Sequence, residues 1–436
     1  MIHFFLRVMC CISLMAQLTV AQMTVVQLTV VQMTVAQISI TGDEVAALKP
    51  FDEMMAAFLA EHQVAGASLA IAKDGAIIYS RGFGLANVET KQPVQPASLF
   101  RIASLSKPIT AAAVMKLVEA GKLKLDDRIV DLLGLDIPPQ PQGDPRWKKI
   151  TIEHLLHHTA GFDRDKSFDP MFRSRAFATE QRVMPPAGAK DVIACMVARL
   201  LDFEPGTKMA YSNFGYCLLG RAIEKASGQS YEAYVKEHVL EPVGVKTMRI
   251  GATRSTAKDE VTYYGFGART GENVFASRAG EPAKVLLPYG AWHLEAMDSH
   301  GGWIASAPDL LRFASIMDGD VVKPGAAERP SRPVLSSDSI KAIFAGPMLA
   351  GDAGKAAAKS PVFYGFGWQV REVGNGQINT WHNGALSGTS SLLVRRHDGL
   401  SWAVLFNGDT GKNNQKLSGL IDGLMHQTAA KVKAWQ

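Results

Sequence analysis

The stretch FRIASLSKPITAAAVMKLVEAG, residues 100–121, combines a Ser-x-x-Lys pair with the start of an apolar helix. Pro108 lies in the first turn of the helix expected from about Leu105 to Ala120, where a missing N–H costs little. Ser104 and Lys107 are three residues apart, so both side chains share one helical face. A lysine can activate a serine if it is neutral and takes the proton, or if its charge lowers the pKa of the hydroxyl. The positive field of a helix start disfavours the ammonium and stabilises negative charge on the serine. The pair predicts a nucleophile at Ser104 with Lys107 as its activator.

The Ser-x-x-Lys pattern is weak by itself, because chance alone places about 1.5 such pairs in a chain of this composition. A second pair, Ser255 and Lys258, lies in a charged, turn-like stretch with no helix start. We interpret this second pair as a surface feature. For Ser104 and Lys107 the alternative interpretation is an N-capping serine beside a solvated lysine.

The tripeptide Tyr211-Ser212-Asn213 is the only Tyr-x-Asn in the chain, where chance predicts about 0.2. Turn residues precede it, and a helix is expected over 213–227. A phenol held near Lys107 can relay the serine proton and later protonate a leaving group. Asn213 can fix a substrate carbonyl. A buried tyrosine followed by a capping asparagine is the alternative interpretation.

A third candidate element is Trp381-His382-Asn383-Gly384, which ends a strand expected over 377–382 and precedes small residues that include Ala385. Basic-x-Gly triplets occur elsewhere too, so the position at a strand end distinguishes this one. An edge strand here would offer a free backbone N–H to a developing oxyanion. We expect His382, Gly384 and Ala385 to bind the substrate.

Strands are expected at both ends of the chain. Near the amino end, residues 67–84 alternate apolar and polar side chains and break at Asp74-Gly75, which is typical of a hairpin. Near the carboxyl end, a last helix over about 414–433 follows four expected strands, 363–370, 377–382, 389–396 and 401–407.

These elements predict an α/β (α+β) fold. An antiparallel sheet is built from both ends of the chain and flanked by helices, and a mostly helical lobe is inserted in the middle. We place the sheet parts at about 50–105 and 300–436. The lobe at about 106–299 contains the helices expected over 190–202 and 213–227. A cleft between sheet and lobe would be a usual place for a small-molecule site.

The three elements, in this order, resemble the penicillin-recognising serine hydrolases. That superfamily includes class C β-lactamases, D-alanyl-D-alanine carboxypeptidases and family VIII carboxylesterases. The resemblance runs from about residue 50 to 430, with softer matches at Leu155–Gly161, Gly301–Trp303 and Ala307–Leu310. It implies a β-lactamase-like fold.

The resemblance also implies roles for the residues that match. Ser104 would be acylated, Lys107 would activate it, and Tyr211 would relay the proton. Asn213 would contact the substrate. The oxyanion hole would use the backbone N–H groups of Ser104 and Ala385.

His382 departs from the pattern, because class C β-lactamases carry lysine at this place. A lysine is a fixed cation suited to the carboxylate of a β-lactam, whereas an imidazole is mostly neutral at pH 7. The histidine suits an uncharged ester better, although some D,D-peptidases of the group also use histidine. We therefore expect a serine hydrolase, a carboxylesterase acting through an acyl-enzyme on short-chain esters. The alternatives are a D,D-peptidase or β-lactamase acting on D-alanyl or β-lactam substrates, and a non-catalytic envelope protein that binds peptidoglycan-like peptides.

The composition and net charge limit the kinds of binding partner that we expect. With 47% hydrophobic and 20% charged residues among 436, the chain is neither disordered nor a coiled coil. The net charge of +5 is spread along the chain without a basic block, so we expect a small-molecule substrate and no nucleic acid. No sequence feature indicates an oligomeric state.

Cofactor motifs are also missing from the sequence. No HExxH or GxxxxGK[ST] occurs, so we expect no metal and no cofactor. The histidines 154, 157 and 158 are interpreted as a helix end beside the cleft, with a zinc site as the less favoured alternative. Cys195 and Cys217 are expected to stay reduced, and one disulfide between them is the alternative.

The amino terminus is predicted to direct export. Residues 1–21 combine a weakly polar start with an apolar run too short to span a bilayer and with small residues suited to cleavage. An uncleaved membrane anchor or a misassigned start codon is the alternative. A five-residue repeat follows, so residues 22–42 are interpreted as a tether outside the fold and 43–436 as the hydrolase domain. The protein is then periplasmic or secreted, with membrane association only through this segment.

Overall fold

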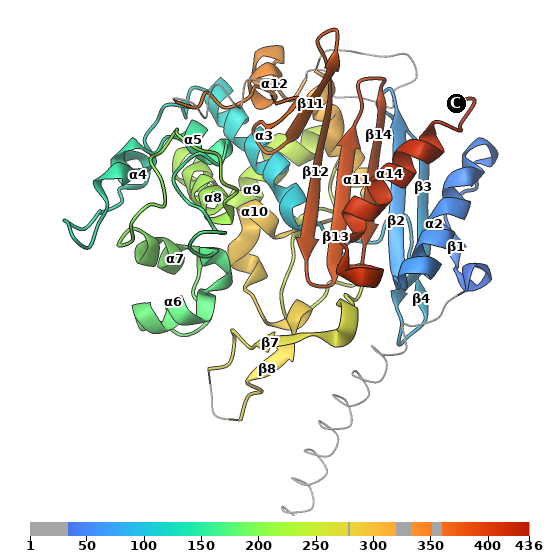
Figure 1. Ribbon diagram of the computed structural model, residues 1–436, viewed down its shortest axis with the longest axis horizontal. Coiled ribbons are helices and arrows are strands. Elements are labelled where there is room, and N and C mark those ends of the chain that lie inside the picture. Colours follow the sequence, from blue (N-terminus) through green and yellow to red (C-terminus); the bar gives the residue numbers. More distant parts are fainter. Residues whose placement is uncertain (1–33, 278–279, 320–332, 351–359, 436) are drawn as a thin grey trace, which may run out of the picture.

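The computed structural model describes residues 34–277, 280–319, 333–350 and 360–435 (Figure 1). Within them, one large antiparallel sheet forms the centre of the molecule. Its strands, in spatial order, are β1 (Ile40–Thr41), β3 (Ala76–Asn87), β2 (Gly66–Lys73), β14 (Leu400–Phe406), β13 (Thr389–Arg395), β12 (Gln377–Leu386), β11 (Gln369–Gly374) and β10 (Val362–Tyr364), with β4 (Gln92–Pro93) paired to β3. The early strand β2 pairs with the late strand β14, Ala70 lying opposite Ala403. The predicted sheet built from both ends of the chain is confirmed.

The hairpin between β2 and β3 forms where the sequence predicts it. Asp74 and Gly75 both have positive φ angles, 52° and 86°, as a tight two-residue hairpin turn requires. Side chains of β2 alternate between two apolar cores, so Leu69 belongs to one core and Ala70 to the other. Both faces of this strand are therefore buried.

Helices cover both faces of the sheet. On the face toward the viewer in Figure 1, α2 (Lys49–His62) and α14 (Leu417–Ala429) pack Phe51 and Ile421 against it. On the other face lie α3 (Ser106–Glu119) and α11 (Ala307–Ala314), which share a core with Ala403. The helix that starts just after Ser104 is thus held inside the larger of the two cores.

The segment between the sheet parts forms the predicted helical lobe, on the left of Figure 1. Its helices are α4 (Ile129–Leu133), α5 (Ile152–Leu156), α6 (Ser174–Gln181), α7 (Ala189–Met196), α8 (Asn213–Ser227), α9 (Tyr231–Val235) and α10 (Asp298–Gly301). Another short helix, α12 (Ser337–Ile343), lies near the end of α3. Two small antiparallel sheets complete the structure: β5 (Phe100–Arg101), β9 (Trp303–Ala305) and β6 (Arg249–Ile250), and the pair β7 (Thr270–Glu272) and β8 (Lys284–Leu286).

The prediction of one strand over 363–370 is wrong. The chain turns between Tyr364 and Gln369, so β10 and β11 are two antiparallel strands. Gly367 permits the turn, because its φ is +75° and a Cβ atom there would lie 2.8 Å from the Lys107 carbonyl oxygen. The turn itself therefore packs against the start of the helix that carries Lys107.

Two predicted helices are shorter in the structure. The helix expected over 190–202 ends at Met196. Leu201 fits the apolar periodicity that suggested a longer helix, but it lies in the loop that follows, and its N–H donates to Asp144. The helix expected over 414–433 is α14, residues 417–429. The residues at its predicted start do not join the helix, because 412–414 form a 3₁₀ turn and Lys416 forms a β-bridge with Thr410.

At the amino terminus, the predicted export signal and most of the predicted tether lie outside the described residues. The end of the tether does not stay outside the fold, however. Ile40 pairs with Phe83 in β1, and Ser39 Oγ donates to the Gly84 carbonyl oxygen at 3.0 Å. The β-prone sequence here completes the edge of β3, so the sheet begins before residue 43.

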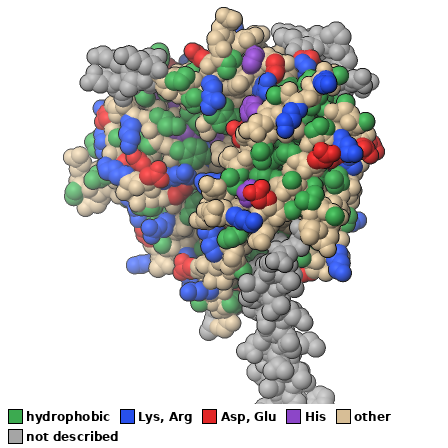
Figure 2. All heavy atoms as spheres, turned by 45° about the vertical axis from the view of Figure 1, so that its right-hand side comes forward, with side chains coloured by type: hydrophobic (Ala, Val, Ile, Leu, Met, Phe, Trp, Pro, Cys, Tyr) green, Lys and Arg blue, Asp and Glu red, His purple; other side chains and the backbone are tan. Residues whose placement is uncertain are grey.

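Three further features concern the surface and the cysteines. Across residues 34–277, 280–319, 333–350 and 360–435, no helix combines the length and apolar character needed to span a bilayer. Basic and acidic side chains are mixed over the face shown in Figure 2. Cys195 and Cys217 are buried free thiols, so the structure has no disulfide between them.

Candidate active site

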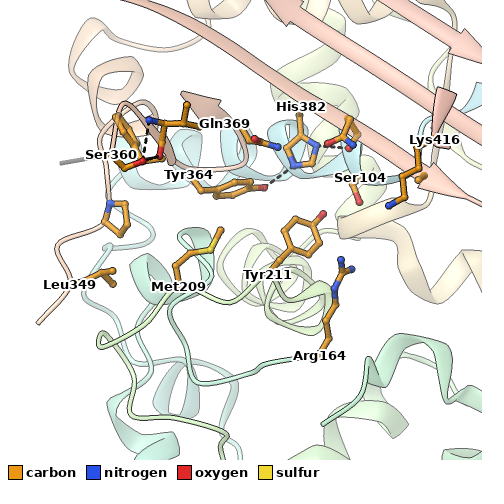
Figure 3. Close-up of a pocket in the computed structure, with 15 residues that line it drawn as sticks. Ser104, Arg164, Met209, Tyr211, Leu349, Ser360, Tyr364, Gln369, His382 and Lys416 are labelled. Carbon is orange, nitrogen blue, oxygen red and sulfur yellow. Dashed lines mark hydrogen bonds between the residues drawn. The ribbon is translucent and has the colours of Figure 1, made fainter. Parts of the chain in front are cut away.

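A cavity of about 550 Å³ lies beside the end of β12 (Figure 3). Four of the sequence-predicted residues line it: Ser104, Tyr211, His382 and Ala385. They come from a turn before α3, from the segment before α8 and from β12. The structure therefore brings the three predicted elements together.

Ser104 lies in a 3₁₀ turn, Ala103–Leu105, immediately before α3. Ala103 has a φ of +47°, a left-handed conformation that costs a non-glycine residue about 1 kcal/mol or more. Two hydroxyls hold the strained turn: Ser106 Oγ donates to the Ala103 carbonyl oxygen at 2.7 Å, and Ser391 Oγ to that of Ile102 at 2.8 Å. The turn places the Ser104 side chain at the cavity.

The end of β12 that faces this turn has a free edge. The pairing of β11 with β12 stops at Trp381, while β13 pairs with β12 as far as Leu386. The strand predicted over 377–382 therefore continues through Ala385, and its last residues have a neighbour on one side only. This is the edge that an oxyanion hole at Ala385 requires.

Lys107 is fully buried, and its amine has three polar neighbours. Its Nζ lies 2.7 Å from Asn213 Oδ1, 2.9 Å from the His300 carbonyl oxygen and 3.2 Å from Ser104 Oγ. Asn213 and His300 offer only acceptors here, because Asn213 Nδ2 donates to Asp169 at 2.6 Å. A neutral amine has two N–H donors and one lone pair. If a neutral amine gives both donors to these acceptors, its lone pair remains available for the proton of the serine hydroxyl, 3.2 Å from Nζ.

Electrostatics favour this neutral amine. Burial lowers the pKa of Lys107 well below its ordinary value; Asp169 opposes the change and Arg164 adds to it. Burial also raises the pKa of Tyr211, against a hydrogen bond from Ser104 and the charge of Arg164. Of the two groups, Lys107 therefore loses its proton more readily than an ordinary lysine, and Tyr211 loses its proton less readily than an ordinary tyrosine.

Tyr211 is held on several sides. Its ring centroid lies 4.7 Å from Lys107 Nζ and 4.6 Å from the Arg164 guanidinium carbon. The next residue, Ser212, caps α8 by accepting a hydrogen bond from the Gly215 N–H at 3.1 Å. Figure 3 shows the phenol directed toward Ser104 and His382. The sequence order of tyrosine, cap and helix thus fixes where the phenol lies.

Asn213 occupies a different place from the one expected. It is not among the residues that line the cavity, and its amide bridges Lys107 and Asp169. It is the first residue of α8, and its oxygen accepts the hydrogen bond from the Lys107 amine. The expected contact between Asn213 and a substrate stays a prediction.

His382 is buried with both ring nitrogens engaged. Nδ1 donates to the Asn383 carbonyl oxygen at 2.7 Å, so Nε2 accepts from the Tyr364 hydroxyl at 2.9 Å. Burial, with Lys107 nearby, lowers the pKa of His382 to about 3. At neutral pH this position carries no positive charge.

Gly384 lies behind the cavity and lets two backbones approach. A Cβ atom there would lie 2.2 Å from the Ile102 carbonyl oxygen and 2.3 Å from Ser391 Oγ. We predict that Gly384→Ala lowers the free energy of unfolding by about 1–3 kcal/mol, since overpacking must push the Ser104 turn away. Thermal melting measures the change. Gly419→Ala, in α14 with nothing within 4 Å, is the matched control and should not destabilise; equal melting temperatures for both variants would contradict the prediction.

Sequence reasoning missed several residues at the site. Arg164, Tyr364 and Lys416 line the cavity, and Asp169 orients Asn213. None of them belongs to a recognisable pattern. His158, which is also buried near the site, was missed too. It is the one missed residue with a sequence signal, because it lies in the soft match at Leu155–Gly161.

The other sequence interpretations can be compared with the structure. Ser255 and Lys258 are exposed, which confirms the second Ser-x-x-Lys as a surface feature. His157 and His158 are buried in aromatic surroundings, His157 against Phe366 and His158 against Tyr211. In the part of the chain that the structure describes, no group of three or more potential ligands is placed to hold a metal ion.

The arrangement can be compared with known proteins. Residues 51–423 match the beta-lactamase family. This chain belongs to that family. The resemblance inferred from the three motifs is thereby confirmed, and so is the predicted fold.

Three known proteins illustrate what this chain is similar to. Penicillin-binding protein 4* of Bacillus subtilis (strain 168) is 28% identical over 346 residues, 78% of this chain and 66% of that protein. Esterase EstB of Burkholderia gladioli is 33% identical over 200 residues, 43% of this chain and 47% of EstB. The matched part of this β-lactamase-family chain thus spans less than two thirds of either relative. The octameric penicillin-binding protein homologue from Pyrococcus abyssi shares the fold, with a TM-score of 0.64, 24% identity and coverage of 89% of this chain and 78% of that one.

Proposed function

We propose that this β-lactamase-family protein is a serine hydrolase that cleaves short-chain carboxylic esters through an acyl-enzyme. The observation that carries the proposal is the buried amine of Lys107, whose Nζ lies 3.2 Å from Ser104 Oγ at the cavity. A base already directed at a hydroxyl is what nucleophilic catalysis by serine needs.

The reaction follows from this geometry in two steps. Lys107 takes the proton of Ser104 as its Oγ attacks the ester carbonyl, and the free edge of β12 beside the helix start stabilises the oxyanion. The C–O bond to the alcohol breaks, and the alcohol leaves with the proton returned through Tyr211. Water then attacks the acyl-serine with the same base, giving the carboxylic acid and restoring the serine hydroxyl.

The neutral side chain of His382 supports an ester over a β-lactam. A buried imidazole whose two nitrogens are engaged by Asn383 and Tyr364 offers no cation for a β-lactam carboxylate. An ester alkoxide also demands less protonation than an amine leaving group. Among the relatives, the name of EstB supports this activity, and the name of penicillin-binding protein 4* supports the second candidate, a D,D-peptidase or β-lactamase.

A substrate comparison tests the proposal. We expect wild-type protein to hydrolyse p-nitrophenyl butyrate with a higher kcat/KM than a chromogenic cephalosporin. Intact mass after incubation with an ester and with a penicillin would show which acyl group accumulates. Faster cephalosporin turnover would favour the second candidate. No turnover together with no adduct from a fluorophosphonate probe would favour a non-catalytic binding protein.

The proton relay has its own test. We predict that Tyr211→Phe lowers ester turnover at least ~10²-fold, because the leaving alkoxide loses its proton donor. Steady-state kinetics with p-nitrophenyl butyrate measure the loss. Tyr234→Phe, which removes a buried phenolic hydroxyl from α9 outside the cavity, is the matched control and should keep its rate. A Tyr211→Phe enzyme at full rate would remove the relay from the mechanism.

A further inference from the structure

One residue at the site has no part in the steps above. His158 lies in the softly matching segment Leu155–Gly161, just after α5, and is only 2% exposed. Its ring lies 4.4 Å from the Tyr211 ring, centroid to centroid. It also contacts the rings of Tyr364 and Tyr216, at 4.6 and 5.0 Å. The imidazole thus forms the back of the pocket that holds the phenol.

His158 also makes two hydrogen bonds to the backbone around Tyr211, and these are more specific than the ring packing. Its carbonyl oxygen accepts a hydrogen bond from the Ala210 N–H at 2.9 Å. Its ring Nδ1 accepts one from the Ser212 N–H at 3.2 Å. The two donors are the residues on either side of Tyr211. One residue therefore holds the chain before and after the tyrosine.

These contacts require one form of the ring. Because Nδ1 accepts the Ser212 N–H, the proton of the neutral imidazole is on Nε2. Nε2 has no hydrogen-bond partner among the described residues. Burial, with Lys107 and His382 nearby, lowers the pKa of His158 well below its ordinary value, which keeps the ring neutral. The unpartnered Nε2 indicates that the useful contact is the one at Nδ1.

The backbone of His158 is also constrained. Its φ of +60° is left-handed, a conformation that costs most residues free energy and that asparagine and glycine tolerate best. This conformation belongs to the turn that aims both the carbonyl and the ring at residues 210–212. A strained residue held in place by its partners is often found at a functional site.

We propose that His158 is a positioning residue that fixes the Tyr211 hydroxyl against Ser104 by holding the backbone on both sides of the tyrosine. The proposal rests on the proposed role of Tyr211 as the proton relay. A displacement of about 1 Å in a catalytic group can lower a rate about 10²-fold. His158 therefore acts on kcat through Tyr211 and not on substrate binding.

Two variants at this position separate the contact from the strain. His158→Gly removes the ring and its acceptor and accepts a φ of +60°. We expect it to lower kcat about tenfold or more and to change KM less than about threefold. His158→Asn tolerates the same φ and keeps an acceptor that can reach the Ser212 N–H, so it should recover most of kcat. A change in KM without a change in kcat would overturn the proposal. So would a kcat that does not recover in His158→Asn.

A double-mutant cycle tests whether His158 acts through the phenol. In a Tyr211→Phe background no hydroxyl remains to be positioned, so His158→Gly should change kcat less than about threefold. Equal losses in both backgrounds would mean a general structural role. His157→Gly is the matched control, because this neighbouring histidine packs on Phe366 and contacts the Tyr364 carbonyl instead. Its effect should be the same in both backgrounds. If His158→Gly does not fold, His158→Phe, which keeps an aromatic ring but no acceptor for the Ser212 N–H, gives the same comparison with and without Tyr211→Phe.

A measurement independent of turnover keeps the two proposals separate. Hydrogen–deuterium exchange of the amides at 210 and 212 should be faster in His158→Gly than in wild type and close to wild type in His158→Asn. We call the two hydrogen bonds from Ala210 and Ser212 to His158 the clamp. A full-rate Tyr211→Phe enzyme with this exchange pattern would refute the relay and leave the clamp. Unchanged exchange in His158→Gly would refute the clamp whatever the kinetics.

Discussion

Ser104→Ala is expected to abolish ester hydrolysis, with a loss of about 10⁴-fold or more, because the enzyme then has no group to acylate. The fold should persist, since Ser104 is partly exposed at the cavity and the turn around it is held by Ser106 and Ser391. Turnover of p-nitrophenyl butyrate measures the first effect. Thermal melting measures the second, and intact mass with a fluorophosphonate identifies the nucleophile, since only wild type should gain the adduct.

The chain supplies its own control for this experiment. Ser255→Ala alters the second Ser-x-x-Lys, whose serine and lysine are both exposed. This variant should hydrolyse the ester and take up the probe like wild type. Ester turnover that survives in Ser104→Ala, or an adduct that remains there, would contradict the assignment of the nucleophile.

Lys107→Arg should lose at least ~10²-fold in turnover, as much as Lys107→Ala, because a guanidinium stays protonated and cannot act as a base. If the residue served only as a fixed positive charge, arginine would keep much of the rate. Thermal melting of both variants checks that the buried site is still folded. Substantial activity in Lys107→Arg would contradict a neutral amine as the base.

The pH profile of the wild-type enzyme tests the same point without a substitution. A base works in its deprotonated form, so kcat/KM should rise with pH as Lys107 loses its proton. Burial lowers the pKa of this lysine, which places the rise well below pH 10.5, the ordinary value. The same shift affects stability: the unfolded chain binds this proton more strongly, so the free energy of unfolding should increase with pH between the folded and unfolded pKa values. A rate that falls with rising pH throughout this range would contradict the assignment.

The parts of the site that the sequence predicts are those with a local cause. Ser104 and Lys107 share a helical face because they are three residues apart, and this spacing survives any packing. Tyr211 and its capping neighbour precede a helix with clear apolar periodicity. The central sheet was predictable too, since β2 and β3 are joined by a turn whose residues tolerate positive φ.

The remaining parts depend on contacts that no local pattern reveals. The His300 carbonyl that holds Lys107 is a backbone group, so its side chain gives no signal. Asp169 comes from a long Pro- and Gly-rich connection, where periodicity is absent. Tyr364 falls within a stretch predicted as one strand, and only the turn after it directs the phenol toward His382. The contacts of Asn213 with Lys107 and Asp169 were not predicted, because a side-chain type does not show which partner it will meet.

The pairing of β2 with β14 has a consequence for biosynthesis. The Gly66 N–H donates to Asn407 Oδ1 across 341 positions, and the oxyanion edge at Ala385 belongs to the same late part of the chain. A nascent chain on the ribosome therefore exposes β2 while its neighbour has still to be translated. Such long-range closure slows folding. It also means that Ser104, the proposed nucleophile, cannot meet the proposed oxyanion edge until β12 has been translated, so products truncated before residue 377 would carry the serine without that edge.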